Sequence, residues 1–184
     1  DAATGLITGT IDPSASTGGP YTVTITASDG TTSTDQSFTW NVANPVPVAA
    51  DDADSTTEDA SITRGAAAGV IQGAGTDSDP DGDTLVVSAV DGAAAGVGAG
   101  VAGSAGGTFV VNADGSYSFD PGADFQDLDT GESRVSTVSY QISDGEGGTD
   151  TATLRVTVTG VNDAPVAGPL ANQSDSDSDT INVD

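Results

Sequence analysis

The sequence contains no cysteine and no histidine, and its only basic residues are three arginines. Without cysteine, no disulfide can reinforce a small core. Without histidine and cysteine, the usual nucleophile–base pairs of covalent catalysis are excluded. Paired carboxylates can hydrolyse glycosides, but one of them needs an apolar cleft that raises its pKa. The acids here stand in polar Gly/Ser turns, so we expect no enzyme activity.

The shortage of basic residues also excludes a nucleic-acid partner, because such partners are held by basic patches. No apolar stretch approaches the length of a membrane helix, so we expect no membrane insertion. The sequence opens with Asp1-Ala2-Ala3-Thr4, which is no signal peptide, and we expect it to be part of a longer chain.

Aromatic residues are few, with one Trp, three Tyr and four Phe. A pocket that recognises a carbohydrate or a peptide would need exposed aromatics. Tyr21 and Trp40 alternate with polar residues, and we expect them in a core rather than in a sugar-stacking site. Carbohydrate or peptide binding is therefore the alternative function, and a glycan array would test it.

Aspartate is abundant, because 25 of the 28 acidic residues are Asp and the formal net charge is −25. Asp is a poor helix former that is typical of turns and of short-reach metal sites. So high a charge causes self-repulsion unless cations bind. Weak acidic calcium sites are typical of extracellular proteins, so the composition indicates a secreted or cell-surface location.

Residues 76–84 form the most acidic loop, with alternating Asp77, Asp79, Asp81 and Asp83. In an extended segment alternate side chains share a face, so these carboxylates would repel one another. Ca²⁺ accepts six to eight oxygen ligands and would remove that repulsion, while Gly82 allows a sharp turn. The order matches the first half of a helical-hand calcium loop, but position twelve is Ser88 instead of Glu. We predict a calcium loop that leads into a strand; a solvated acidic turn is the alternative.

Thr, Val and Ser fill the periodic segments, which is typical of an all-β chain. Apolar and polar side chains alternate over residues 138–142 and 153–159, as in an antiparallel sheet with one buried face. Residues 112–115 (Asn-Ala-Asp-Gly) predict a hairpin turn. Residues 92–107 are rich in Gly and Ala and predict a long flexible loop or a weak edge strand. Together these signals predict a two-sheet sandwich.

An internal repeat divides the chain. Ser28-Asp29-Gly30 recurs as Ser143-Asp144-Gly145, and Pro-Val-Ala triplets begin at residues 47 and 165, which is a spacing of 118 residues. We therefore predict one complete module over 45–165, the closing part of a preceding module over 1–44, and the opening of a following one over 166–184.

Several motifs resemble the bacterial cadherin-like and VCBS-type repeats of giant RTX adhesins. They are Ala50-Asp51-Asp52 with Glu58-Asp59, the acidic loop 77–83, and residues 112–117, 131–133, 143–148 and 160–166. Residues 3–10 and 19–23 resemble a PIG-type Ig-like repeat of the same proteins. The resemblance implies Ig-like/cadherin-like antiparallel β-sandwich modules in tandem, secreted by bacteria through a type I system.

The resemblance also implies Ca²⁺ at the joints between neighbouring repeats. Bound calcium would stiffen a stalk that holds an adhesive tip away from the cell, in cell adhesion and biofilm. Ligands from two modules would share the ions, and the candidates at the two joints are Asn162 and Asp163 at the module exit, and Asp51, Asp52 and Glu58 just after the equivalent joint at Asn44. A Pro-containing linker with exposed acids is the alternative.

Further candidate ligands stand in turns: Asp144, Glu146 and Asp150 at a predicted hairpin tip, and Glu132 before a long strand. For the hairpin tip, a simple Asp-Gly turn is the alternative. Asp175, Asp177 and Asp179 resemble the acidic loop and would form half of another site.

The two partial modules should expose unpaired strand edges and apolar surface. We therefore predict strand complementation between copies, in which residues 1–43 pair with the 166–184 strand of another copy.

Overall fold

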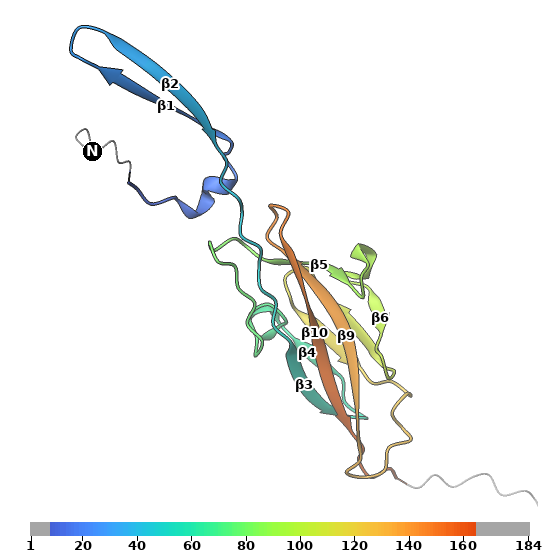
Figure 1. Cartoon of the computed structure of the whole chain (residues 1–184). Coiled ribbons are helices and arrows are strands. Elements are labelled where there is room, and N and C mark those ends of the chain that lie inside the picture. The colour runs from blue at the N-terminus through green and yellow to red at the C-terminus, as the bar shows by residue number, and fades with distance from the viewer. Residues whose placement is uncertain (1–7, 165–184) are drawn as a thin grey trace, which may run out of the picture.

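A computed structural model describes residues 8–164 of the protein, and their regular structure consists of strands and three short 3-10 helices (Figure 1). The strands are β1 (Tyr21–Ser28), β2 (Ser33–Trp40), β3 (Asp52–Thr57), β4 (Ile62–Arg64), β5 (Val86–Val90), β6 (Gly100–Ala102), β7 (Thr108–Val111), β8 (Tyr117–Asp120), β9 (Ser133–Ser143) and β10 (Thr149–Thr159). The helices are η1 (Pro13–Ser16), η2 (Ala66–Ala68) and η3 (Ala94–Gly96), and none within the described part is long enough to cross a membrane. The all-β class is confirmed.

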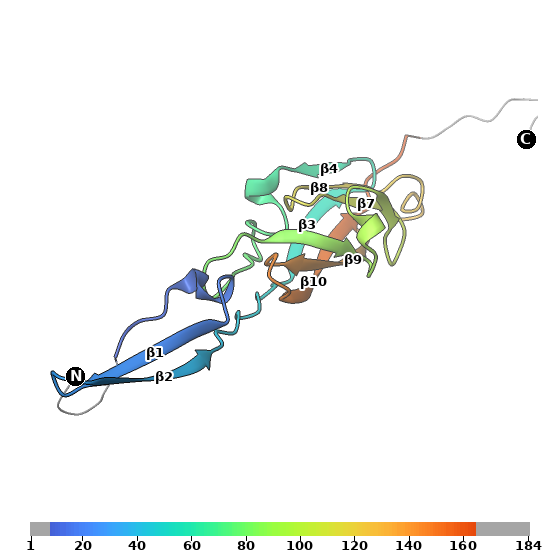
Figure 2. The same ribbon diagram turned by 90° about the horizontal axis from the view of Figure 1, so that it is seen from above.

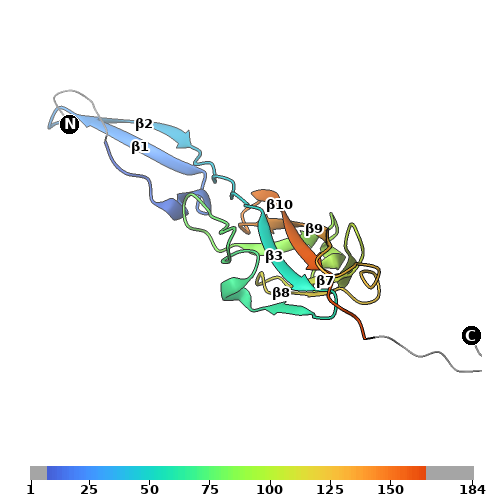
Figure 3. The ribbon, with the colours of Figure 1, turned by 90° about the horizontal axis from the view of Figure 1, so that it is seen from below.

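Eight strands form an Ig-like sandwich of two four-stranded sheets (Figures 1 and 3). One sheet has the order β3-β10-β9-β5 and the other the order β4-β8-β7-β6. All neighbours are antiparallel except β3 and β10, which run parallel from Leu154↔Asp52 to Thr159↔Thr57. The chain therefore enters and leaves the sandwich at opposite ends. We call these the linker end, where residues 41–51 join β3, and the distal end, where β10 stops.

The alternation predicted for the two long strands is confirmed. Leu154, Val156 and Val158 are fully buried, and the residues between them on β10 are not. Tyr140 on β9 is 1 % exposed, and Phe109 packs on Phe119 with ring centroids 4.5 Å apart.

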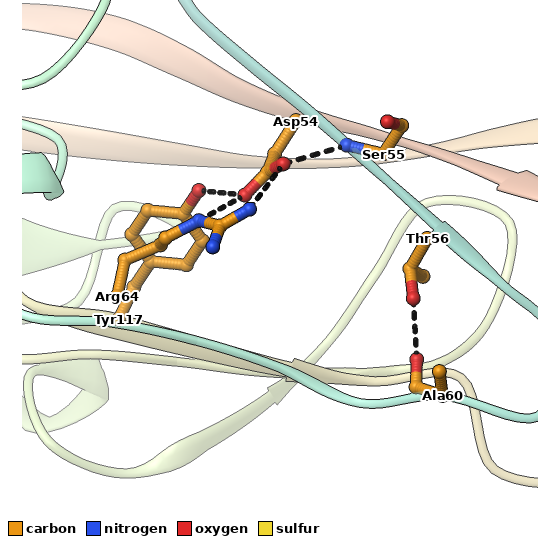
Figure 4. A network of polar contacts seen from close by, with 6 residues as sticks. All are labelled: Asp54, Ser55, Thr56, Ala60, Arg64 and Tyr117. Carbon is orange, nitrogen blue, oxygen red and sulfur yellow. Dashed lines mark hydrogen bonds and ion pairs between the residues drawn. The ribbon is translucent and has the colours of Figure 1, made fainter.

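A polar network joins the two sheets near the linker end (Figure 4). Asp54 on β3 accepts two hydrogen bonds from Arg64 on β4, at 2.7 and 2.9 Å, and one from the Tyr117 hydroxyl on β8, at 2.7 Å. Burial alone would raise the pKa of Asp54, but the hydrogen bonds from Arg64 and Tyr117 lower it. Arg64, one of the three arginines, therefore forms its ion pair with Asp54 and not with the acidic loop.

The predicted hairpin turn and weak edge strand are also present. Residues 112–115 connect β7 to β8, and the Asn112 carbonyl accepts from the Gly115 N–H at 3.0 Å. The Gly/Ala-rich segment 92–107 contains η3 and the three-residue strand β6, which forms the edge of its sheet.

β1 and β2 form a separate two-stranded sheet that projects beyond the linker end of the sandwich (Figure 2). Tyr21 pairs with Trp40, and these side chains are 38 % and 46 % exposed. The expectation that both lie in a core is therefore wrong. Their alternation with polar residues does define an apolar face, but within residues 8–164 no second sheet covers it.

Candidate metal centre at the linker end

Three of the four predicted loop carboxylates converge. Asp79, Asp81 and Asp83 each offer an oxygen, and these oxygens lie within 4.8 Å of one another. The turn is organised by Asp79, whose Oδ1 accepts from the backbone N–H groups of residues 81, 82 and 83 at 3.1 to 3.2 Å. Gly82 takes a φ of +89°, which a residue with a Cβ rarely adopts. Loop geometry thus places all three acids on one concave side.

One oxygen of each of these acids is buried and has no hydrogen-bond partner: Asp79 Oδ2, Asp81 Oδ1 and Asp83 Oδ2. Buried acceptors are nearly always partnered, and an unpaired one costs free energy. Three unpaired anionic oxygens side by side fit a hard cation that prefers oxygen ligands, as Ca²⁺ does.

The electrostatics agree with this fit. Contact between the Asp79 and Asp81 carboxyl groups raises the pKa of Asp81 to about 6 and lowers the pKa of Asp79. Burial, and then the negative charge of Glu146, raise the pKa of Asp83. The described arginines with ion-pair partners use acids elsewhere, namely Asp54 and Asp127. Within residues 8–164 no basic side chain forms an ion pair with this group, so a cation from solution would relieve its repulsion.

The turn between β9 and β10 brings further oxygens to the same place. Asp144 is held by the N–H groups of Glu146 and Gly148, which donate to its Oδ1 at 2.8 and 2.9 Å. Its Oδ2 accepts from Asn44 Nδ2 at 2.9 Å. The charges of Glu146 and Asp144 both act on Asp83, so the turn and the acidic loop face each other. The alternative reading of a simple Asp-Gly turn does not account for the contact with Asn44.

The segment before β1 also reaches this group. The Ser16 hydroxyl, at the end of η1, lies 2.8 Å from Asn44 Oδ1 and 2.8 Å from Glu146 Oε2. Its single proton can serve only one of them at a time. We call Asp79, Asp81, Asp83, Asp144, Glu146 and Asn44 the joint cluster. The predictions did not single out Ser16, because an isolated Ser in a Pro-Ser-Ala-Ser run carries no spacing signal.

Asp77 is separated from the joint cluster. It is 6 % exposed and accepts from the Ala50 N–H at 2.8 Å. The Tyr140 hydroxyl lies 2.9 Å from Asp52 Oδ2 and 3.4 Å from Asp77 Oδ1, so the two carboxylates share one hydroxyl donor. Burial raises the pKa of Asp77 to about 6 and also raises the pKa of Asp52. This arrangement anchors the base of the acidic loop to β3 and β9; a metal role for these two acids stays a prediction.

Asp51 and Asp150 fasten the linker to β10. Asp150 Oδ2 accepts from the Ala49 N–H at 2.9 Å, and Asp51 Oδ1 accepts from the Thr153 N–H at 2.8 Å. The hydrogen bond from Ala49 is the main reason why the pKa of Asp150 is lowered. Both side chains thus have structural partners, and their predicted ligation of a metal stays untested.

Glu58 lies at the distal end, and its predicted grouping with Asp51 and Asp52 is wrong. It follows β3, whose six residues carry the chain roughly 20 Å along the sandwich. Glu58 is 1 % exposed; its Oε1 accepts from the Val161 N–H at 2.7 Å, and its Oε2 has no partner.

Glu132, Asn162 and Asp163 lie at the same end as Glu58. Glu132 Oε2 accepts from the Asp129 N–H at 3.1 Å, and Asn162 Nδ2 donates to the Asp163 carbonyl at 3.2 Å. These residues lie near the point where the chain leaves β10 and continues toward residue 165. Asp175, Asp177 and Asp179, the predicted half-site beyond it, lie outside the described residues.

Sequence models of two families match the chain. Residues 44–160 match the family described as "Bacterial cadherin-like domain", and residues 1–43 match the family described as "Putative Ig domain". These matches confirm the cadherin-like and Ig-like resemblance. Domains of both kinds are typically extracellular structural repeats without enzyme activity, and cadherin-like domains commonly bind calcium.

Comparison with individual proteins adds little. No curated protein matches the sequence. Among solved structures, a nucleoside hydrolase-related hypothetical protein from Saccharophagus degradans, described as associated with carbohydrate metabolism, is 20 % identical with a TM-score of 0.34. The match covers 65 % of this chain and 26 % of that one, and so weak a likeness carries no functional argument.

Proposed function

The chain belongs to the bacterial cadherin-like domain family, and on that premise we propose that it is a calcium-stabilised extender segment of a secreted bacterial surface adhesin of the RTX type. Calcium at the joint cluster would rigidify a stalk used in cell adhesion and biofilm formation. The observation that carries the proposal is the set of three buried, unpartnered Asp oxygens beside the contact between Asn44 and Asp144.

The segments that meet at the joint cluster explain how an ion would act mechanically. Asn44 belongs to the linker, Asp79 to the loop before β5, and Asp144 to the turn after β9. Ser16, from the segment before β1, contacts Asn44 and Glu146. An ion that binds oxygens from linker and sandwich at once would fix the direction in which the linker leaves. Without it, the like charges of the cluster repel, and the linker is held by hydrogen bonds alone, such as those from Asn44 and Ala49 to Asp144 and Asp150.

The distal end supports a second, shared site. Glu58 Oε2 is buried and unpartnered, and Glu58 Oε1 accepts from the N–H of Val161, which directly precedes Asn162 and Asp163. Acids of a following repeat would complete the ligand set, so neighbouring repeats of the same chain are the proposed partners.

Small-angle X-ray scattering tests the proposal on the full chain. With saturating Ca²⁺ we expect a narrow distribution of interatomic distances, and after chelation a broader one with a changed maximum dimension. The triple variant Asp79→Asn, Asp81→Asn, Asp83→Asn should give one profile in both conditions. Mg²⁺ at equal ionic strength is the control, because it binds poorly to flexible all-protein sites. A wild-type profile that calcium leaves unchanged would contradict the proposal.

A further inference from the structure

The β1–β2 hairpin carries an apolar face that the described residues leave open. Directly paired residues share one face of a sheet, and the pairs Tyr21↔Trp40 and Val23↔Phe38 are followed by Ile25 on the same side. Phe38 and Ile25 are 47 % and 45 % exposed. A contiguous apolar surface of this kind marks an interaction site.

This face is also hollowed. A cleft of about 800 Å³ lies between the segment around Ile11 and the hairpin, and its apolar lining includes Tyr21, Val23, Trp40 and Val42. The sheet has only two strands, so each has one edge free of strand pairing within residues 8–164. A third strand would gain backbone hydrogen bonds at an edge and apolar contact in the cleft.

We propose that this face and edge receive residues 165–184 of a second copy of the chain, in a head-to-tail contact. In that segment Ile181 and Val183 alternate with Thr180, Asn182 and Asp184, the pattern of a strand with one apolar side. The hairpin contains no basic residue, and the segment is rich in Asp. Attraction must therefore come from apolar burial and backbone pairing instead of from opposite charges.

The length of the chain favours a second copy over the same copy. Residue 165 follows the distal end, while the hairpin lies beyond the linker end (Figure 2). The 17 residues from 165 to 181 reach at most about 60 Å. The 11 residues of β10 alone occupy roughly 37 Å of that path. The remaining length, about 20 Å, would have to pass the linker end and then reach along the hairpin. The segment of a neighbouring copy does not have to cover this path.

Trp40, the chain's only tryptophan, reports on the face directly. We expect its fluorescence to shift to shorter wavelength as protein concentration rises, together with a rising average mass in sedimentation velocity. The measurements are made in chelator and high salt, so that they do not depend on the joint cluster and so that charge repulsion is screened.

Two pairs of matched variants locate the contact. Ile181→Asp and Phe38→Asp should each weaken association by roughly tenfold or more, because each places a charge in an apolar contact. Asn182→Asp and Ser37→Asp add the same charge on the opposite faces and should change it less than about twofold.

Mixing the two damaging variants decides the geometry. Ile181→Asp keeps an intact face, and Phe38→Asp keeps an intact segment, so their mixture should form a one-to-one pair at concentrations at which each variant alone stays monomeric. This outcome does not require the Phe38 variant's own hairpin to remain folded. Failure of the mixture to associate would overturn the proposal. So would a shift of Trp40 emission that does not vary with concentration, or association that survives Ile181→Asp.

Discussion

The two Ser-Asp-Gly turns have the same three residues and different surroundings. In the turn of the hairpin, Asp29 Oδ1 accepts from the N–H groups of Thr31 and Thr32, both at 2.8 Å, and within residues 8–164 the Asp29 side chain has no hydrogen-bond partner outside its own turn. Asp144 makes similar turn bonds but offers its second oxygen to Asn44, 100 residues earlier in the chain. A local motif therefore sets the turn, and only tertiary placement beside the acidic loop gives Asp144 a role at the joint.

The largest expected effect on calcium binding comes from removing the charges of the acidic loop, which lies beside Asp144 but has no counterpart beside Asp29. In the variant Asp79→Asn, Asp81→Asn, Asp83→Asn, isothermal titration should show no calcium binding at the linker end. Without metal, this variant should melt no lower than the wild type, because the repulsion among three acids is gone. Calcium binding that persists at the wild-type level would mean that other residues hold the ion.

The matched substitution Asp144→Asn against Asp29→Asn tests the comparison itself. We expect calcium affinity to fall about tenfold or more in the first, because one charged ligand is lost, and to be unchanged in the second. Isothermal titration gives both values. Equal losses in the two variants would show that total charge matters and position does not.

Stability of the ion-free protein should depend on pH through Asp77. Its folded pKa of about 6 exceeds the ordinary value of 3.8, so the folded state binds the proton more tightly than the unfolded state. The resulting stabilisation is complete below about pH 4 and is lost as pH rises through 6. Metal-free protein should thus melt a few degrees higher at pH 5 than at pH 7.5.

Asp77→Asn should reduce this dependence to the part that Asp81 contributes, whose pKa is also raised to about 6, while Asp29→Asn should leave it in place. Hydrogen bonds from the Thr32 and Thr31 N–H groups lower the pKa of Asp29, which gives the opposite sign. A wild-type melting temperature that rises steadily from pH 5 to 7.5 would contradict a buried, protonatable Asp77.

The smallest expected effect is that of Ser16→Ala. It removes one hydrogen bond to Glu146 or Asn44 and should weaken calcium binding a few-fold with little change in melting temperature. Ser14→Ala is the control in the same helix, because the only described hydrogen bond of the Ser14 hydroxyl is the one to Asp12 Oδ1. If the two variants behave alike, the segment before β1 does not support the site.

The sequence was sufficient for features that depend on local pattern. Alternation on β9 and β10 predicted the buried face, and the acidic loop predicted convergence of four carboxylates, which three of them show. Long-range features were not accessible in this way. Glu58 lies at the distal end because β3 pairs parallel with β10. The residues around Glu58 carry no local pattern that predicts this pairing.

In two places the side chains lie differently from what the local pattern predicts, and for a shared reason. Asp77 has the same spacing as the other loop acids, but the hydrogen bond from the Ala50 N–H turns its carboxylate toward Tyr140. Tyr21 and Trp40 have a core-like alternation, but a core needs a second layer, which periodicity in one hairpin does not specify. The domain limits at 44/45 and 165/166 stay predictions.

The central claim is that calcium stabilises this chain through its Asp-rich joints, and differential scanning calorimetry tests it most directly. Free Ca²⁺ at 100 times the dissociation constant contributes about 2.7 kcal/mol. For a chain of this length the melting temperature should then fall by about 5–10 °C when calcium is chelated. Superimposable melting curves in calcium and in excess chelator would contradict the claim.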